Sequence, residues 1–168
     1  TLLVELGGEI NSIDASAFHA IVKDTSSAWN VADELKIEAE PETASDVLIQ
    51  NNATLTVNGS TTIESNATLT IDHANFTRFA GNATAPITGG GRLKILNGSS
   101  VHFQSANIDA LEVSGADSLA RGGTSKFRTM ILTSGGRFST YDDGVIITGM
   151  SEAEVTQLVA NGYNNGAW

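Results

Sequence analysis

Residues 49–57 read IQNNATLTV, and the pattern returns fourteen residues later as IESNATLTI at residues 63–71. In both copies apolar side chains alternate with threonine, which is the period of a half-buried β-strand. The return of such a strand at a fixed spacing indicates strands that stack by repetition. The stretch therefore predicts an all-β protein built as a β-solenoid, most simply a right-handed parallel β-helix. An antiparallel β-sandwich made from the same strands is the alternative.

Composition agrees with this prediction. Apolar residues make up 40% of the 168 residues but aromatic residues only 6%, as expected for short β-branched strands joined by small corner residues. The net charge of −10 excludes nucleic acid and anionic membrane surfaces as partners. No apolar run is long enough to insert into a membrane. The chain has no cysteine, but a secreted protein with a large repetitive core can do without disulfides, so this does not place it in the cytosol. Because it begins at Thr1, we interpret it as a processed or excised segment.

We expect one domain over residues 1–168 with three parts. Residues 1–45 form an irregular N-terminal cap or edge, residues 46–149 carry the repeats, and residues 150–168 hold a helix and a tail. Residues 18–23 fit either a short helix or a strand. A coil of about 14 to 24 residues and a rise of about 4.8 Å per coil predict about five to seven coils.

The helix is predicted from its start and stop signals. Ser151 and Glu154 form a capping box, and Val155, Leu158 and Val159 follow as an apolar stripe. The dipeptide at 161–162, Asn-Gly, ends the helix. Stacked strands expose unpaired backbone at the ends of a solenoid, so we expect this helix to cap or brace one end.

The C-terminal segment resembles a known class of proteins. The strand VIIT at 145–148, the capped helix and the tail GYNNGAW at 162–168 are similar to the C-terminal signature of large secreted bacterial proteins with autotransporter-associated β-strand repeats, familiar from planctomycetes. The NATLTV pattern is similar to their internal repeats. The resemblance implies a role at the cell surface or in a matrix, and it supplies no catalytic residue.

Catalytic and metal-binding patterns are weak, and we expect no catalytic, cofactor-binding or metal-binding residue. Asp142 and Asp143 resemble the paired carboxylates of polysaccharide hydrolases, but no histidine follows them, and a turn is the simpler interpretation. The carboxylates of residues 38, 40 and 42 fit a solvated strand face better than a calcium site. The three histidines, His19, His73 and His102, are too widely spaced to suggest zinc.

Six Asn-x-Ser/Thr sequons fall between residues 52 and 97, at Asn52, Asn58, Asn66, Asn75, Asn82 and Asn97. They are candidate glycosylation sites. Asparagine at solenoid corners followed by outward threonine produces the same pattern without any glycan. The repeat also places Asn52 and Asn66 in equivalent positions, which suggests a stacked amide ladder.

These observations favour a non-enzymatic, extracellular structural protein that forms a surface layer, a matrix or a fibre of identical subunits. The alternative is a polysaccharide-binding or polysaccharide-degrading β-helix protein with a carbohydrate partner. Self-assembly by strand addition would use the N-terminal strand, with Leu2, Leu3, Val4 and Leu6 filling apolar gaps in a neighbour. The competing expectation is that this strand pairs within its own chain, near residues 35–39.

Overall fold

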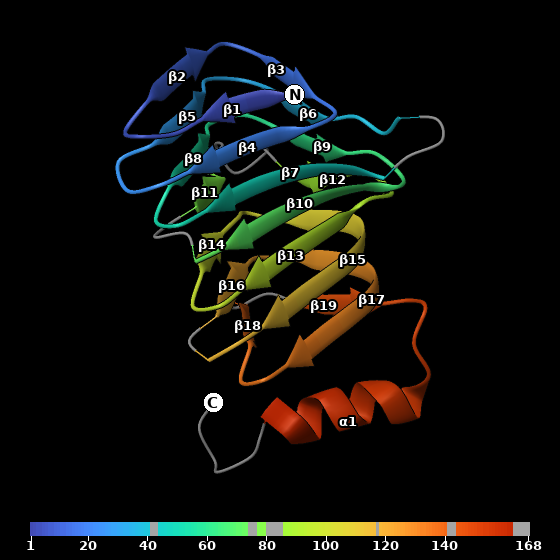
Figure 1. Cartoon of the computed structure of the whole chain (residues 1–168). Coiled ribbons are helices and arrows are strands. Elements are labelled where there is room, and N and C mark those ends of the chain that lie inside the picture. Colours follow the sequence, from blue (N-terminus) through green and yellow to red (C-terminus); the bar gives the residue numbers. More distant parts are fainter. Residues whose placement is uncertain (41–43, 74–76, 80–85, 117, 141–143, 163–168) are drawn as a thin grey trace.

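The computed structural model describes residues 1–40, 44–73, 77–79, 86–116, 118–140 and 144–162, and it is a β-solenoid of about six turns (Figure 1). All strand pairs among these residues are parallel. In Figure 1 the front strands run from right to left, the chain returns behind them, and the coils descend toward the C-terminus. This course is a right-handed β-helix. The predicted solenoid is confirmed, and the antiparallel sandwich is wrong.

Three strands make one coil, and strands from successive coils stack into three faces. The first face holds β1 (Leu2–Val4), β4 (Ala20–Lys23), β7 (Ser45–Gln50), β10 (Ala67–Asp72) and β13 (Arg92–Leu96), followed by the second halves of β15 (Ala106–Ser114) and β17 (Ser125–Thr133). The second face holds β2 (Glu9–Ser12), β5 (Ala28–Val31), β8 (Thr54–Val57), β11 (Thr77–Phe79), β14 (Ser100–His102), β16 (Leu119–Gly122) and β18 (Arg137–Thr140). The third face holds β3 (Ala15–Ala17), β6 (Leu35–Ile37), β9 (Thr61–Ile63) and β12 (Ile87–Thr88), then the first halves of β15 and β17, and β19 (Val145–Ile147).

The first and third faces belong to one sheet because β15 and β17 run through the corner between them. The start of β15 pairs with β12 on the third face, and the end of the same strand pairs with β13 on the first face. Earlier coils need a loop at this corner, whereas β15 bends through it at Asp109. Loss of the loop opens the surface there.

Alternation along each strand sends every second side chain into the solenoid, where equivalent side chains of successive coils stack in columns. One such column on the first face consists of Leu2, Ala20, Val47, Leu69, Leu93, Leu111 and Met130. Coil length varies along it, with eighteen residues from Leu2 to Ala20 and twenty-seven from Ala20 to Val47. The extra residues lie in corners, so the column stays continuous.

The fourteen-residue repeat is a repeat of corner and strand, and its copies do not stack. The first copy ends in β8 on the second face, and the second copy ends in β10 on the first face. Leu55 of β8 stacks on Trp29, and Leu69 of β10 stacks on Val47. Both copies have the same local structure, which consists of an asparagine with positive φ, a buried alanine and an alternating strand.

The first 45 residues are regular, which corrects the expectation of an irregular cap. Strands β1 to β6 form the first two coils, and residues 20–23 are a strand, so the helical alternative for this segment is wrong. β1 pairs with β4 and not with residues 35–39, which pair through β6 with β3 and β9. The corners of these coils differ in length, so the strands do not recur at a constant spacing that the sequence alone would reveal.

Aromatic side chains fill the widest parts of the core. Trp29 lies between Ile10 and Leu55 of the neighbouring coils and is almost fully buried. In the last coils the ring of Phe127 meets that of Phe138 edge-on at 5.8 Å between ring centroids. The Phe138 ring also lies 6.3 Å from that of Phe103, so these three phenylalanines form a cluster near the C-terminal end.

The helix α1 (Glu152–Gly162) follows the last strand and lies across the C-terminal end of the solenoid (Figure 1). The predicted capping box is confirmed, since the Glu154 carboxylate accepts a hydrogen bond from the Ser151 backbone N–H at 2.7 Å, and the Ser151 hydroxyl accepts one from the Glu154 N–H at 3.3 Å. Leu158 packs against the core, whereas Val159 of the predicted stripe is 52% exposed. The helix is therefore held to the solenoid by a narrow contact.

The capping box makes the start of α1 sensitive to pH. The hydrogen bond from the Ser151 backbone N–H holds the pKa of Glu154 below its usual range. A lowered folded-state pKa stabilises the helix start above the unfolded pKa, and this contribution is lost as pH falls through the folded pKa. We expect Ser151→Ala to speed amide hydrogen exchange in the first turn about fivefold at neutral pH. Acid should lower the protection factors of the same amides in the wild type, after the intrinsic exchange rates are corrected for pH. Unchanged exchange in Ser151→Ala would contradict this role, and Thr156→Ala on the same helix is the control.

Candidate functional site at the N-terminal end

The first coil leaves three strand edges unpaired among the described residues. β1, β2 and β3 each pair only with the next coil, through β4, β5 and β6. Their outer edges therefore present backbone N–H and C=O groups that can pair with another strand. We call this surface the N-terminal end and define it by residues 1–18.

Each of the three corners of this first coil carries an exposed bulky apolar side chain. Leu6 is 86% exposed at the first corner, Ile13 is 73% exposed at the second, and Phe18 is 42% exposed at the third. We call these three residues the apolar rim. Single exposed apolar residues are ordinary on protein surfaces, but one at every corner of a terminal coil is a pattern.

At two of these three corners the next coil has a polar residue at the same position. The pairing of β1 with β4 and β7 places Leu6 above Asp24 and Asn51. The register of β2 with β5 places Ala32 under Ile13, and Glu38 follows the strand that stacks under β3, below Phe18. At the corners of Leu6 and Phe18 the first coil therefore departs from the pattern that the rest of the solenoid follows.

The backbone at Leu6 is left-handed, with φ of 57°. The stacked residues Asp24, Asn51, His73 and Asn97 also have positive φ, and all of them belong to types that tolerate this conformation. Leucine does not, and a non-glycine residue held there costs about 1 kcal/mol or more. Leu6 is thus both strained and exposed, a combination that folding of the single chain does not explain.

The residues predicted for strand addition divide between core and surface. Val4 is buried and Leu2 packs against the core, so neither is free to enter a neighbour, which corrects the prediction for this pair. Leu3 is 53% exposed and faces outward beside Leu6. Sequence reasoning missed Ile13 and Phe18, because their position at corners follows from the coil boundaries.

Large exposed apolar side chains are confined to the two ends of the solenoid. Besides Leu3 and the apolar rim, those among the described residues are Ile131, Ile146 and Val159. None lies between residues 19 and 130 in the described part of the chain. The sides of the solenoid are therefore polar, and its ends are the apolar surfaces.

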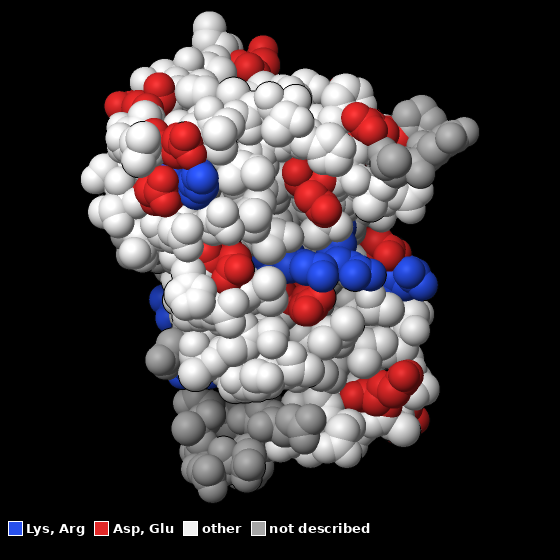
Figure 2. Space-filling model, viewed as in Figure 1, with Lys and Arg blue, Asp and Glu red and all other residues white. Residues whose placement is uncertain are grey.

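Charge is also distributed unevenly along the solenoid axis. Residues 1–40 hold eight acidic and two basic side chains, whereas residues 119–140 hold four basic side chains and no acidic one. On the face seen in Figure 2, basic side chains gather in a band halfway along the solenoid, with acidic side chains on both sides of it. Residues 1–40 are acidic and residues 119–140 are basic, so these two segments have complementary charge, although the acidic residues Asp142, Asp143, Glu152 and Glu154 follow in the chain.

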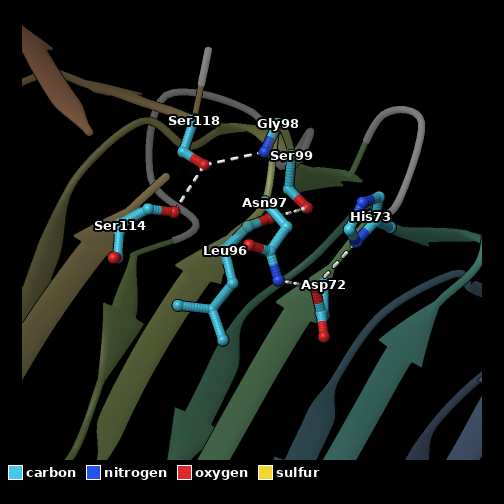
Figure 3. A network of polar contacts seen from close by, with 8 residues as sticks. All are labelled: Asp72, His73, Leu96, Asn97, Gly98, Ser99, Ser114 and Ser118. Carbon is cyan, nitrogen blue, oxygen red and sulfur yellow. Dashed lines mark hydrogen bonds and ion pairs between the residues drawn. The ribbon is translucent and has the colours of Figure 1, made fainter. Parts of the chain in front are cut away.

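Asparagines with positive φ turn the chain at the corner between the first and second faces (Figure 3). Asn97 has φ of 51°, and its side-chain amide donates to the Asp72 carboxylate of the preceding coil at 2.7 Å. The Ser118 hydroxyl accepts from the Gly98 N–H at 2.9 Å, which joins the next coil. His73 contacts Asp72 at 3.2 Å and is largely exposed, so this network has a structural role at the corner.

The four sequons among the described residues lie at corners, as the alternative to glycosylation requires. Asn52 and Asn97 lie at the first corner, Asn58 at the second and Asn66 at the third, and all four are exposed. Asn52 and Asn66 occupy different corners, so the predicted ladder between them is wrong. Asn75 and Asn82 lie outside the described residues. Glycosylation at the exposed sequons remains a prediction.

No group of three or more histidine, cysteine, aspartate or glutamate residues in the described part of the chain could hold a metal ion. Glu38 forms an ion pair with Lys36 at 3.1 Å, and Lys36 also pairs with Glu64 at 2.9 Å. The two hydrogen bonds from Lys36 and the Ala39 N–H lower the pKa of Glu64. Glu42, Asp142 and Asp143 lie outside the described residues.

No helix among the described residues is long and apolar enough to cross a membrane. Comparison of the chain with family models, curated proteins and solved structures finds no match. The resemblance of the C-terminal segment to secreted repeat proteins therefore remains a prediction. The functional argument rests on the geometry of the N-terminal end.

Proposed function

We propose that this protein is a non-enzymatic, extracellular structural subunit whose N-terminal end associates with another copy of the chain. Repetition of that contact would build a surface layer, a matrix or a fibre. The observation that carries the proposal is Leu6, which is exposed and backbone-strained at a corner where other coils have polar residues. Strain kept at an exposed position is typical of sites that act through binding.

Association would remove the apolar rim from water. Burying one leucine, isoleucine or phenylalanine side chain contributes about 2 kcal/mol. The unpaired edges of β1, β2 and β3 would gain hydrogen bonds at the same time, which fixes the geometry of the contact. Leu3 lies beside this edge and adds to the apolar surface.

Charge favours a head-to-tail arrangement over one that joins two N-terminal ends. Two N-terminal ends would bring acidic side chains together, among them the exposed Glu9 and Asp14. The segment 119–140 offers the exposed cations Lys126, Arg128 and Arg137. Strand β17 pairs with β19 through residues 125–127, and Gly149 and Met150 contact its backbone at Arg128 and Met130, so a new strand would pair with the edge beyond Met130. A head-to-tail contact uses two different surfaces, so it propagates into a filament.

The helix α1 lies where the incoming copy would dock (Figure 1). We therefore expect a chain that ends at Met150 to associate more strongly than the full chain. Sedimentation velocity over a range of concentrations measures the effect, and electron microscopy distinguishes filaments from closed particles.

Three outcomes separate the possibilities. Larger species formed by the truncated chain support the head-to-tail contact. Dimers of the same affinity in both chains would show that two N-terminal ends meet instead. Monomers in both chains at every concentration would overturn the proposal.

A further inference from the structure

A groove of about 620 Å³ lies at the corner between the third and first faces, and its lining begins in the second coil at Glu40. It crosses four successive coils. Its lining consists of Glu40, Ala44, Ser65, Asn66, Ala67, Thr68, Gly90, Gly91, Arg92 and Asp109. Its size is that of sites that hold small organic ligands.

The groove forms because Gly90 and Gly91 have no side chains and because β15 has no loop at this corner. Gly90 stacks over Ser65 so closely that a Cβ on Gly90 would lie 2.3 Å from the Ser65 hydroxyl oxygen. A Cβ on Gly91 would lie 2.3 Å from a methyl carbon of Ile63. In the next coil β15 bends through the corner at Asp109 without a loop. At Gly90 and Gly91 the groove is therefore lined by backbone, and its other lining residues contribute side chains.

Hydrogen-bond donors and acceptors alternate around the groove. Glu40 and Asp109 offer carboxylate acceptors, Arg92 and Asn66 offer donors, and the hydroxyls of Ser65 and Thr68 can do either. Arg128 binds the Asp109 carboxylate through two hydrogen bonds, one of them 2.8 Å long, and lowers the pKa of that carboxyl. Asp109 is therefore ionised at neutral pH and held in one orientation.

This lining selects for a class of ligand. With Arg128 included, the two carboxylates and two guanidinium groups balance, so an isolated anion or cation gains little there. The lining is more polar than apolar, so a purely apolar ligand would leave polar groups of the groove without hydrogen-bond partners. A polyhydroxylated ligand fits, because each hydroxyl both donates and accepts a hydrogen bond. We infer that the groove binds neutral sugar residues of a polysaccharide, with Arg92, Asn66 and Asp109 as the main contacts.

The test uses the full chain labelled with ¹⁵N, titrated with cellohexaose, chitohexaose and hexagalacturonate while amide shifts are recorded. We expect at least one of the two neutral hexasaccharides to shift amides of residues 65–68 and 90–92. Arg92→Ala should weaken that binding about tenfold, because a charged hydrogen bond is lost. Lys94→Ala is the matched control, since Lys94 is the next outward side chain of the same strand and lies outside the groove.

The inference is overturned if neither neutral hexasaccharide shifts these amides, if only hexagalacturonate does, or if Lys94→Ala weakens binding as much as Arg92→Ala. The result is independent of self-association. Sugar binding should persist in a variant whose apolar rim is replaced, and the rim can drive association whether or not the groove binds sugar.

Discussion

Replacement of the apolar rim, with Leu6→Asn, Ile13→Ser and Phe18→Ser combined, is expected to abolish self-association of the protein while its β-solenoid stays folded. Leu6 and Ile13 are mostly exposed in the single chain, so the assembly loses about 2 kcal/mol at each of these sites, and less at Phe18, which is 42% exposed. Three sites together change the association constant by several powers of ten. Light scattering and sedimentation velocity at matched concentrations measure this effect.

The single substitution Leu6→Asn distinguishes an interface residue from a structural one. Asparagine tolerates the left-handed backbone at this corner, as Asn51 and Asn97 do at the same corner of later coils. We therefore expect the monomer to gain up to about 1 kcal/mol in free energy of unfolding while association weakens.

Leu48→Ser is the control for these variants, since Leu48 also faces outward but lies two coils away from the end. Association that survives the triple substitution would show that the apolar rim is not the interface. So would an equal loss in the Leu48→Ser control.

Phe127→Ala should cost about 3 to 5 kcal/mol in the free energy of unfolding, which is the largest stability effect we expect from one substitution. Phe127 is fully buried and its ring packs edge-on against Phe138. Neighbouring coils cannot close the resulting cavity, because their backbones are fixed by the pairing of β17 with β15 and β19.

Phe18→Ala is the matched control for this prediction, since it removes the same side chain from an exposed corner. We expect it to change the free energy of unfolding by less than about 0.5 kcal/mol. Chemical denaturation of both variants gives the comparison. Equal losses would show that the three-phenylalanine cluster adds no more to stability than an exposed ring does.

Much of the solenoid is readable from the sequence, since its strands and corners are defined by nearby residues. The alternating stretch at 49–57 contains the strand β8 (Thr54–Val57), and the one at 63–71 contains all of β10 (Ala67–Asp72) except its last residue, as their alternation predicts. The Ser151 and Glu154 capping box also forms as predicted, because it needs only residues within one turn of each other. The prediction of five to seven coils agrees with the observed six or so.

Stacking is decided only in the tertiary structure. Coil lengths differ, so sequence spacing does not reveal which strand lies on which, and the fourteen-residue repeat joins neighbouring faces instead of neighbouring coils. The first two coils were missed for the same reason. Their strands are short, and no constant interval connects them.

Both candidate sites depend on that stacking. Leu6 stands out only once it is placed above Asp24 and Asn51 in a shared left-handed conformation. The groove exists because Gly90 lies on Ser65, twenty-five residues earlier in the chain. The sequence by itself determined the strands, the corners and the helix cap, because their causes are local. Tertiary structure decided the apolar rim and the groove, because each is formed by residues from different coils that meet only after the chain has wound.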